Sequence, residues 1–373
     1  MTDLTKRTWA EVDLSAIEHN FKEMKSHLPA GGKFLGVVKA DSYGHGAVPI
    51  SKRLQEAGCD YLAVACLDEA RILRDNGITL PLMILGYTPP EYARELAERG
   101  ITQAVGSLEA AKAFSAQLAG TGLTLKCHLK LETGMGRTGF RAFGSDELAD
   151  AVQAVALPGL DFEGIFTHFC VSDGNEEVRK FTNVQFERFT GSWKKIEELS
   201  GHKFAIHHCT NSGAMISFPE TYSDMVRPGL ALYGYYPGDD RGSIDLQPVM
   251  SLYSRVAYIV HHEPGDTISY GRTFTVEKPS DIAVLPIGYA DGLIRLLSNR
   301  LKVIINGQSI PQVGRICMDM CMLDVTGLDV KPGDVAEIFG KNQSLVDVAA
   351  LAETIPYELC SCLTPRVPRI YVG

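Results

Sequence analysis

A lysine stands at the end of an apolar run in the stretch 34-FLGVVKADSYGHGA-47, and a loop of small and polar residues follows it. An ammonium group that is buried without a counter-charge is unfavourable, so burial lowers the pKa of a lysine toward neutrality. The neutral amine of Lys39 could then form a Schiff base with an aldehyde. A second interpretation stays open, in which Lys39 pairs with the nearby carboxylate of Asp41.

A candidate anion site lies in 210-TNSGA-214 and 227-RPGLALYG-234. Asn211 or Ser212 stands where a helix would begin, and the small residues there leave backbone N–H groups open to an anion. Taken alone, the same residues also fit an ordinary helix cap.

A candidate general base is Tyr270, in 269-SYGRTFTV-276, although most tyrosines are core or surface aromatics. A tyrosine base needs a lowered pKa and hence a cationic neighbour. His168 and Arg227 could supply a hydrogen-bond chain to it if two domains, or two subunits, meet at one site.

Two further stretches are open to more than one interpretation. Arg137 is presented by the glycine-rich 130-KLETGMGRTGF-140, where it could equally be a surface residue on a turn, and 314-GRICMDM-320 fits a sheet edge as well as a site. Metal binding is not expected, because the pairs 207-HH-208 and 261-HH-262 lack a spaced third ligand. We predict that these histidines are core or surface residues.

The elements that must position these side chains alternate over the first two thirds of the chain. Helical spacing is found at 47–58, 107–120 and 176–199, between apolar runs typical of strands at 34–40, 61–67, 81–87, 102–107, 124–132, 162–169, 204–210 and 224–234. Such alternation predicts a parallel sheet, since parallel neighbours need crossover connections.

Eight strands of this kind would close into a (β/α)8 TIM barrel, with an open doubly wound sheet as the alternative. The polar candidates favour the barrel, because they gather at the C-terminal ends of the runs, where barrel enzymes build their sites. A barrel also brings strand one next to strand eight, and barrels often hold phosphate after strands seven and eight. Lys39 beside a phosphate site suggests pyridoxal phosphate.

The pattern changes after residue 240, where short apolar runs are separated by Gly, Pro, Asn and Asp. This is typical of a mostly β domain. We therefore predict a barrel domain over 1–240 and a C-terminal mostly-β domain over 241–373. The alternation in 8-TWAEVDL-14 indicates a strand, and the residues up to about 12 could pair with the C-terminal domain instead.

Composition excludes several classes of protein. The 373 residues are 45% hydrophobic and 22% charged, as in soluble globular proteins, and a net charge of −9 without a basic run disfavours binding to nucleic acid or to an acidic membrane. The nine cysteines are scattered without a CxxC pair, so we expect reduced thiols. Neither a signal peptide nor a membrane-spanning run is found, which predicts a cytoplasmic protein.

These motifs, in this order, resemble those of the alanine racemases over nearly the whole chain. The matching stretches are 9-WAEVDLSAIEHN-20, 37-VVKADSYGHGA-47, 130-KLETGMGR-137, 227-RPGLALYG-234, 269-SYGRTF-274, 287-IGYADG-292, 314-GRICMDM-320 and 366-RVPRIY-371. The resemblance implies a barrel that binds pyridoxal 5′-phosphate, a C-terminal β domain and a head-to-tail homodimer. Each site would combine one subunit's barrel with its partner's β domain.

The resemblance also implies roles for single residues. Lys39 matches the Schiff-base lysine, which is also the base for the D-enantiomer, and Tyr270, contributed by the partner, matches the base for the L-enantiomer. Arg227 matches the residue that faces the pyridine nitrogen, and His168 bridges it to the tyrosine. Further matches contact the cofactor phosphate (Tyr43, Ser212, Gly229, Leu230 and Tyr357, with Asn211 beside them) or the substrate carboxylate (Arg137 and Met318).

The implied reaction interconverts L-alanine and D-alanine with two bases on opposite faces, and it supplies D-alanine for peptidoglycan. Because an arginine keeps its proton up to a pH above about 12, Arg227 should leave the cofactor ring a weaker electron sink and so limit transamination. Lys130 matches a lysine that is carbamylated in some members, where it orients the arginine matching Arg137. A plain structural lysine is the alternative. Glu132 stands where relatives often have aspartate.

Three other functions fit the sequence less well. A racemase for serine, or of broad specificity, is disfavoured by the bulky Tyr357 near the substrate methyl group and by the lack of an export signal. A barrel decarboxylase would lack the Tyr270 motif. A non-catalytic pyridoxal-phosphate carrier would be a single-domain barrel.

Overall fold

The computed structural model describes residue 5 and residues 7–144, 147–173, 176–238 and 241–373, and the chain forms two compact units. The first, here called the barrel unit, comprises Ile17–Ser42 and Ala47–Gln247. The second, here called the β unit, comprises Met1–Ala16, Tyr43–Gly46 and Pro248–Gly373. The predicted domain boundary after Asp240 lies outside the described residues.

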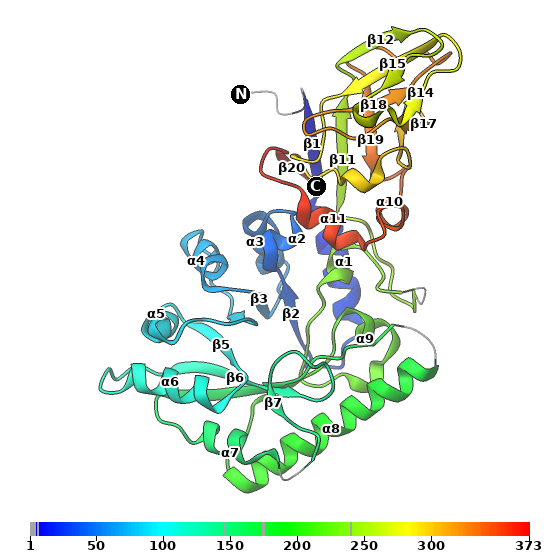
Figure 1. The fold of residues 1–373 in the computed structure, drawn as a ribbon. Helices are drawn as coiled ribbons and strands as arrows, with labels where there is room; N and C mark the ends of the chain where they lie inside the picture. The colour runs from blue at the N-terminus through cyan, green and yellow to red at the C-terminus, as the bar shows by residue number, and fades with distance from the viewer. Residues whose placement is uncertain (1–4, 6, 145–146, 174–175, 239–240) are drawn as a thin grey trace. The chain divides into compact units, whose positions relative to one another are not determined.

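The barrel unit contains eight parallel strands in the order β10-β2-β3-β4-β5-β6-β8-β9 (Figure 1). Their bounds are β2 Lys33–Val37, β3 Tyr61–Val64, β4 Leu82–Ile84, β5 Ile101–Val105, β6 Leu125–Glu132, β8 Leu160–Phe166, β9 Ile206–His208 and β10 Met225–Val226. Backbone hydrogen bonds from Asp224 N to His207 O (3.1 Å) and from Arg227 N to Thr210 O (2.9 Å) join the two ends of this path. The result is a nearly closed barrel, and the short strand β7 (Phe140–Arg141) pairs with β6 outside the path.

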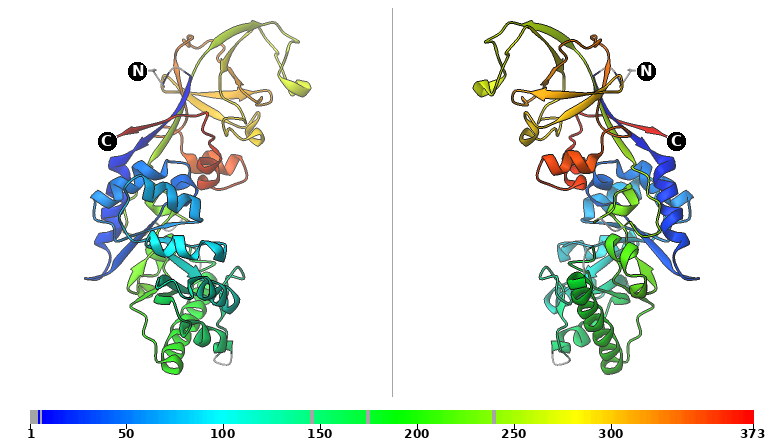
Figure 2. Two further views of the ribbon diagram at one scale, coloured as in Figure 1. Left: turned by 90° about the vertical axis from the view of Figure 1, so that its left-hand side faces the viewer. Right: turned by 90° about the vertical axis from the view of Figure 1, so that its right-hand side faces the viewer.

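Helices follow most of the strands and lie outside the barrel (Figure 2). They are α1 Leu14–Ser26, α3 Ala47–Glu56, α4 Leu67–Asp75, α5 Ala93–Glu98, α6 Leu108–Leu118, α7 Ala149–Val155, α8 Glu176–Ser200 and α9 Ser212–Ser217. Local chemistry sets their starts. At α6, for example, the side chain of Ser107 accepts a hydrogen bond from Ala110 N at 3.1 Å, which satisfies one of the free N–H groups of the first turn.

Strand β6 differs from the other barrel strands because it is buried along most of its length yet alternates apolar with polar residues. Alternate residues of a strand share a face, so its polar residues lie together: Lys126, His128, Lys130 and Glu132. His128 and Lys130 are buried. The sequence therefore places ionisable groups in the interior of the barrel unit.

The β unit contains a nine-stranded sheet in the order β12-β15-β18-β17-β16-β19-β11-β1-β20, and β13 pairs with β14 separately. The strands are β1 Thr8–Asp13, β11 Met250–Arg255, β12 Tyr258–His262, β13 Thr267–Ile268, β14 Phe274–Thr275, β15 Ser280–Leu285, β16 Lys302–Ile305, β17 Gln308–Val313, β18 Cys321–Asp324, β19 Val335–Phe339 and β20 Arg369–Val372. The N-terminal strand β1 lies between β11, to which it is antiparallel, and β20, to which it is parallel. Two helices, α10 Leu345–Leu351 and α11 Pro356–Cys362, complete the unit. The predicted fold class, a TIM barrel with a C-terminal mostly-β domain, is confirmed.

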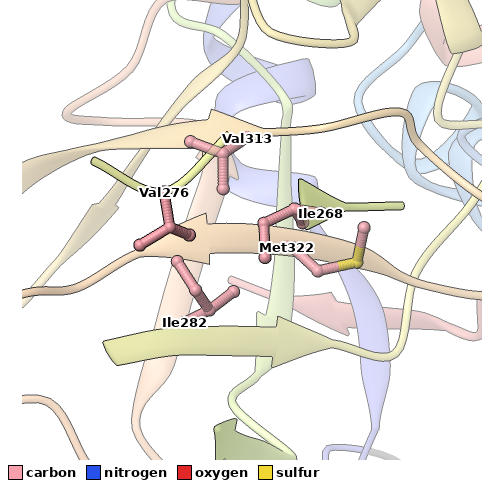
Figure 3. Close-up of a cluster of buried hydrophobic side chains, with 5 residues drawn as sticks. All are labelled: Ile268, Val276, Ile282, Val313 and Met322. Atoms are coloured by element: carbon pink, nitrogen blue, oxygen red, sulfur yellow. The ribbon is translucent and has the colours of Figure 1, made fainter. Parts of the chain in front are cut away.

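A small apolar cluster anchors the part of the β unit that carries Tyr270 (Figure 3). Its members are Ile268, Val276, Ile282, Val313 and Met322, all buried. Each side chain of this kind stabilises a fold by about 1.5–3 kcal/mol when it leaves water. The cluster therefore holds β13 and β14, and with them the 3-10 turn η6 (Tyr270–Arg272) that joins the two strands.

The sequence predicts no membrane-spanning segment and reduced cysteine thiols, and the structure bears on both predictions. In the part of the chain that is described, no helix is long and apolar enough to span a membrane. All nine cysteines fall within that part and are free thiols.

Candidate active site

Lys39 directly precedes a backbone turn of an unusual kind. The segment α2 (Lys39–Tyr43) is labelled in Figure 1. Four successive residues in it have left-handed dihedral angles, from Ala40 (φ 52°) to Tyr43 (φ 53°), and none of them is glycine. Each such residue costs roughly 1–2 kcal/mol relative to a right-handed conformation. Strain of this size persists only where the surroundings impose it, and it is often found at functional sites.

Two carboxylates impose the turn. Glu69 of α4 accepts hydrogen bonds from Ala40 N and Ala65 N, both at 2.7 Å, so it joins the start of the turn to the end of β3. Asp41 accepts from Ala47 N at 2.7 Å and thereby caps α3. Neither Asp41 nor any other carboxylate in the described segments forms an ion pair with Lys39, although the charge of Glu69 acts on it. Burial, and next the charge of Arg137, lower the pKa of Lys39.

Arg227 is buried at the C-terminal end of β10, among acceptors at the ends of the two strands β8 and β9. Its Nη2 donates to the carbonyl oxygens of Thr167 (2.8 Å) and Cys209 (3.2 Å), and its Nη1 lies 3.0 Å from Nδ1 of His208. No described residue accepts a hydrogen bond from its Nε. Burial lowers the pKa of Arg227 to about 10, so the side chain stays cationic at neutral pH.

His168 follows β8, and its Nδ1 lies 3.4 Å from Nη2 of Arg227. Burial, reinforced by the charge of Arg227, lowers its pKa well below the usual range. An imidazole in this place is neutral at pH 7 and can accept a hydrogen bond from the arginine.

Lys130 lies on the inner face of β6, where its Nζ donates to Leu131 O at 2.6 Å. Its ammonium also lies over the ring of Phe166, 5.5 Å from the centroid. Burial lowers the pKa of Lys130 to about 7, and the charges of Arg227 and Arg137 add to this effect against the opposing effect of Glu132. A substantial neutral fraction of this amine is therefore present near physiological pH.

Arg137 is exposed in the loop after β6, and Glu132 shapes that loop. The Glu132 carboxylate accepts hydrogen bonds from Gly134 N (2.5 Å) and Arg137 N (3.2 Å). Burial would raise the pKa of Glu132, but these backbone hydrogen bonds outweigh burial and lower it. Gly139 closes the loop at φ 128°, where a Cβ would lie 2.7 Å from the backbone of Leu131 and Glu132. Glu132, to which the sequence assigned no role, thus fixes the position of Arg137.

Five of the candidates form one electrostatic cluster. The charges of Lys39, Lys130, Arg137 and Arg227 all lower the pKa of His168, and Arg137 acts on each of the three other cationic groups. Like charges gathered at one end of a barrel create a positive potential. This end of the barrel is suited to a ligand that carries more than one negative charge.

The predicted anion site also lies at the ends of β9 and β10. Asn211 caps α9 by accepting from Ala214 N at 3.0 Å. The buried Ser212 Oγ accepts from Gly229 N (2.9 Å) and Ala231 N (3.2 Å), and Leu230 begins the 3-10 turn η5 (Leu230–Tyr233). A hydroxyl that accepts twice still has its proton to donate. Ser212 can therefore donate to an anion while it orders this turn.

The remaining four candidates belong to the β unit. Tyr270 lies in η6 and its residue is 71% exposed, Met318 is 52% exposed, and Tyr357 lies in α11. The rings of Tyr43 and Tyr357 meet edge to face with centroids 6.2 Å apart. Burial raises the pKa of Tyr43, so its hydroxyl keeps its proton and can act as a hydrogen-bond donor.

Three further residues, His208, His128 and Glu163, lie next to Arg227 and to one another in the barrel unit. The sequence did not indicate them as residues of a site. His208 contacts His128, and His128 faces Glu163. We predicted His207 and His208 as core or surface residues, and His208 is fully buried. The only signal in the sequence is the polar residue at every second position of 125-LKCHLKLE-132.

Both units of the chain match the same family of known proteins. The family model described as alanine racemase, N-terminal domain, matches residues 12–237, and that described as alanine racemase, C-terminal domain, matches residues 249–371. The alanine racemase of Desulforamulus reducens is 44% identical over 369 residues, which cover 98% of this chain and 99% of the relative.

Solved structures agree with this result. The alanine racemase of Clostridium difficile 630 superposes with a TM-score of 0.93 at 38% identity, covering 99% of this chain and 96% of that one. The alanine racemase of Bacillus anthracis, determined with bound L-Ala-P, has a TM-score of 0.93 at 34% identity and covers 99% and 95% of the two chains.

Proposed function

The chain belongs to the alanine racemase family, and from that premise we propose that it is a pyridoxal 5′-phosphate-dependent isomerase that interconverts L-alanine and D-alanine. In a cell it would supply D-alanine for peptidoglycan. The observation that carries the proposal is the placement of Lys39. Its amine lies at the mouth of the barrel with a lowered pKa and without a described carboxylate partner, in a cluster of cationic groups.

The residues of the barrel unit fit the proposed cofactor. The Lys39 amine would hold its aldehyde, and the Ser212 hydroxyl with the turn at Gly229 and Leu230 would hold its phosphate. Tyr43, Tyr357 and Asn211 are assigned to the same phosphate end. Arg227, whose Nε has no acceptor in the described chain, would face the ring nitrogen. When bound, the cofactor supplies a conjugated ring that accepts electron density from the substrate Cα.

The two bases are Lys39 and Tyr270. Racemisation removes a proton from one face of Cα and returns a proton to the other, so two groups must stand on opposite faces. We assign Lys39 to the D-face and Tyr270 to the L-face. His168 links Arg227 to the tyrosine, and Arg137 and Met318 are assigned to the substrate carboxylate.

We further propose that the enzyme is a cytoplasmic homodimer with domains 1–240 and 241–373. Each site would take Lys39 from one subunit and Tyr270 from the other. Tyr270 and Met318 are 71% and 52% exposed within the β unit, so both side chains are accessible to a partner subunit, as this assignment requires.

The test is production of D-alanine from L-alanine by purified protein with pyridoxal 5′-phosphate, followed by chiral chromatography. Lys39→Ala and Tyr270→Phe are each expected to lose at least about a hundredfold in rate, the usual contribution of a proton-transferring side chain. Lys52→Ala and Tyr258→Phe are matched controls, because both residues are exposed and lie outside the site.

Hydrogen exchange in D₂O separates the two bases. Tyr270→Phe should still exchange the Cα hydrogen of D-alanine, through Lys39, but should not exchange that of L-alanine. An inactive parent protein would overturn the assignment of alanine, and L-serine would then be the next substrate to assay.

A further inference from the structure

A chain of polar contacts runs through the barrel interior below Arg227. Nη1 of Arg227 lies 3.0 Å from Nδ1 of His208, and Nε2 of His208 lies 2.7 Å from Nδ1 of His128. Nε2 of His128 in turn lies 3.6 Å from Oε1 of Glu163. The opposite oxygen of Glu163 pairs with the half-exposed Lys126 at 2.7 Å. The chain thus links the buried guanidinium to a carboxylate at the edge of the barrel.

The backbone of β8 is adapted to these contacts. In the pairing of β6 with β8, Cys127 is opposite Phe162 and His128 is opposite Gly164, so Glu163 is an extra residue in a β-bulge. Bulges change the direction of a side chain. Gly164 leaves room for the imidazole of His128, because a Cβ at that position would lie 2.5–2.7 Å from three atoms of the ring. Without that space His128 could not reach His208 across β8.

The groups at both ends dictate where the protons lie. A guanidinium can only donate, so Nδ1 of His208 is an acceptor toward Arg227. The Glu163 carboxylate, 3.6 Å from Nε2 of His128, can only accept, so that nitrogen carries hydrogen and Nδ1 of His128 is an acceptor. His208 must then donate through Nε2, which leaves a lone pair on its Nδ1 toward Arg227. Burial lowers the pKa of both imidazoles, so neither is charged at neutral pH. The nearby His128 ring and the hydrogen bond from Lys126 outweigh burial and lower the pKa of Glu163 to about 2.

We propose that Glu163, His128 and His208 are positioning residues for Arg227: the carboxylate stabilises the same tautomer in both histidines that the guanidinium requires, so that His208 stays an acceptor toward Arg227. The opposite tautomers would set the Nδ1–H of His208 against the N–H of Arg227. The consequence for the reaction rests on the proposed function, in which Arg227 faces the cofactor ring. The tautomers themselves do not depend on that function.

The first experiment therefore uses the protein without cofactor. Ring-¹⁵N-labelled histidine is observed by long-range ¹H–¹⁵N correlation, which distinguishes N–H from bare nitrogen in each ring. We expect His128 and His208 to carry hydrogen on Nε2 in the parent protein. Glu163→Gln, which keeps the shape but can also donate, should raise the fraction of the opposite tautomer in both rings. Asp161→Asn is the matched control, since Asp161 is an exposed carboxylate on the same strand.

The second experiment measures kcat/KM for L-alanine in the loaded enzyme. Glu163→Gln should lower it about tenfold, the value of one hydrogen bond to a charged group. In a His208→Gln background the amide oxygen can accept from Arg227 without help from Glu163, so adding Glu163→Gln should then have little further effect. Gly164→Ala, which displaces His128, should resemble Glu163→Gln in both experiments.

Each outcome decides a separate point. Unchanged ring tautomers in folded Glu163→Gln would overturn the proposal, whatever the activity. Altered tautomers with unchanged kcat/KM would show that the contacts serve packing only. A parent protein with the expected tautomers but no racemase activity would count against the proposed function and leave the proton arrangement standing.

Discussion

At the scale of single residues, Lys130 is the clearest case in which burial sets chemistry. An amine with a pKa of about 7 is largely free to react with carbon dioxide, and a carbamate would carry a negative charge toward the cationic cluster. We propose that Lys130 is carbamylated and that the carbamate orients Arg137. Protein equilibrated with ¹³C-bicarbonate should then show one protected carbamate signal by ¹³C NMR. A Lys130→Met variant should lack it, and a parent spectrum without the signal would indicate a plain structural lysine.

The same lysine gives a pH dependence to stability in buffers free of carbon dioxide. The folded pKa is about 7 and the reference value is 10.5, so between these limits the unfolded chain binds more protons than the folded protein. The free energy of unfolding should therefore rise as the pH increases through this window, and below about pH 7 the folded protein bears the full cost of the buried charge.

Lys130→Met removes this contribution. Its stability relative to the parent should be greatest at about pH 6.5 and should decrease steadily toward about pH 9.5. Urea unfolding at one protein concentration measures the difference. Lys52→Met, at an exposed position, should show no such trend, and a pH-independent difference for Lys130→Met would contradict the low pKa.

At the scale of elements, the left-handed turn after Lys39 shows what sequence patterns miss. The apolar run 34–40 is correctly predicted as a strand, but β2 ends at Val37 and the chain turns through four left-handed residues. Little in 40-ADSY-43 favours that conformation, since none of the four is glycine and only Asp41 is of a type that adopts it occasionally. Glu69 and Asp41 impose it through hydrogen bonds that exist only after α3 and α4 are in place.

A glycine in the turn should relieve part of this strain. Ala40 is exposed and left-handed, so Ala40→Gly should raise the free energy of unfolding by about 0.5–1 kcal/mol after the entropy of glycine in the unfolded chain is subtracted. Ala116→Gly in the exposed, right-handed part of α6 is the matched control and should lower it by about 1 kcal/mol. Equal signs for the two substitutions in urea unfolding would show that the turn is unstrained.

Much of the fold could be predicted because its signals are local. The eight apolar runs correspond to the eight barrel strands, and the helices at 47–58, 107–120 and 176–199 correspond to α3, α6 and α8. The boundaries are less accurate where Pro228 and Gly229 end β10 after two residues. The contacts among Glu163, His128 and His208 were not predictable, because they depend on a bulge and on the order of β6, β8 and β9 in the barrel.

At the scale of the whole molecule, the proposed exchange of Tyr270 between subunits has a direct test. Lys39→Ala and Tyr270→Phe chains are mixed under conditions that let dimers exchange. In a mixed dimer one site would combine an intact Lys39 with an intact Tyr270, and the other would have neither. Random pairing should restore about a quarter of the parent racemase activity. Sites made within one chain would give no recovery, and size-exclusion chromatography with light scattering checks that dimers form.

The position of β1 bears on how the protein is made. The strand at Thr8–Asp13 leaves the ribosome before the barrel sequence, yet both of its neighbours, β11 and β20, follow the entire barrel sequence. At about 5–20 residues per second it waits on the order of ten to fifty seconds for β11 alone. The barrel can fold during that delay, while an unpaired strand remains open to other nascent chains. High-level production of this enzyme in a cell therefore requires that β1 be kept from pairing with other nascent chains during synthesis.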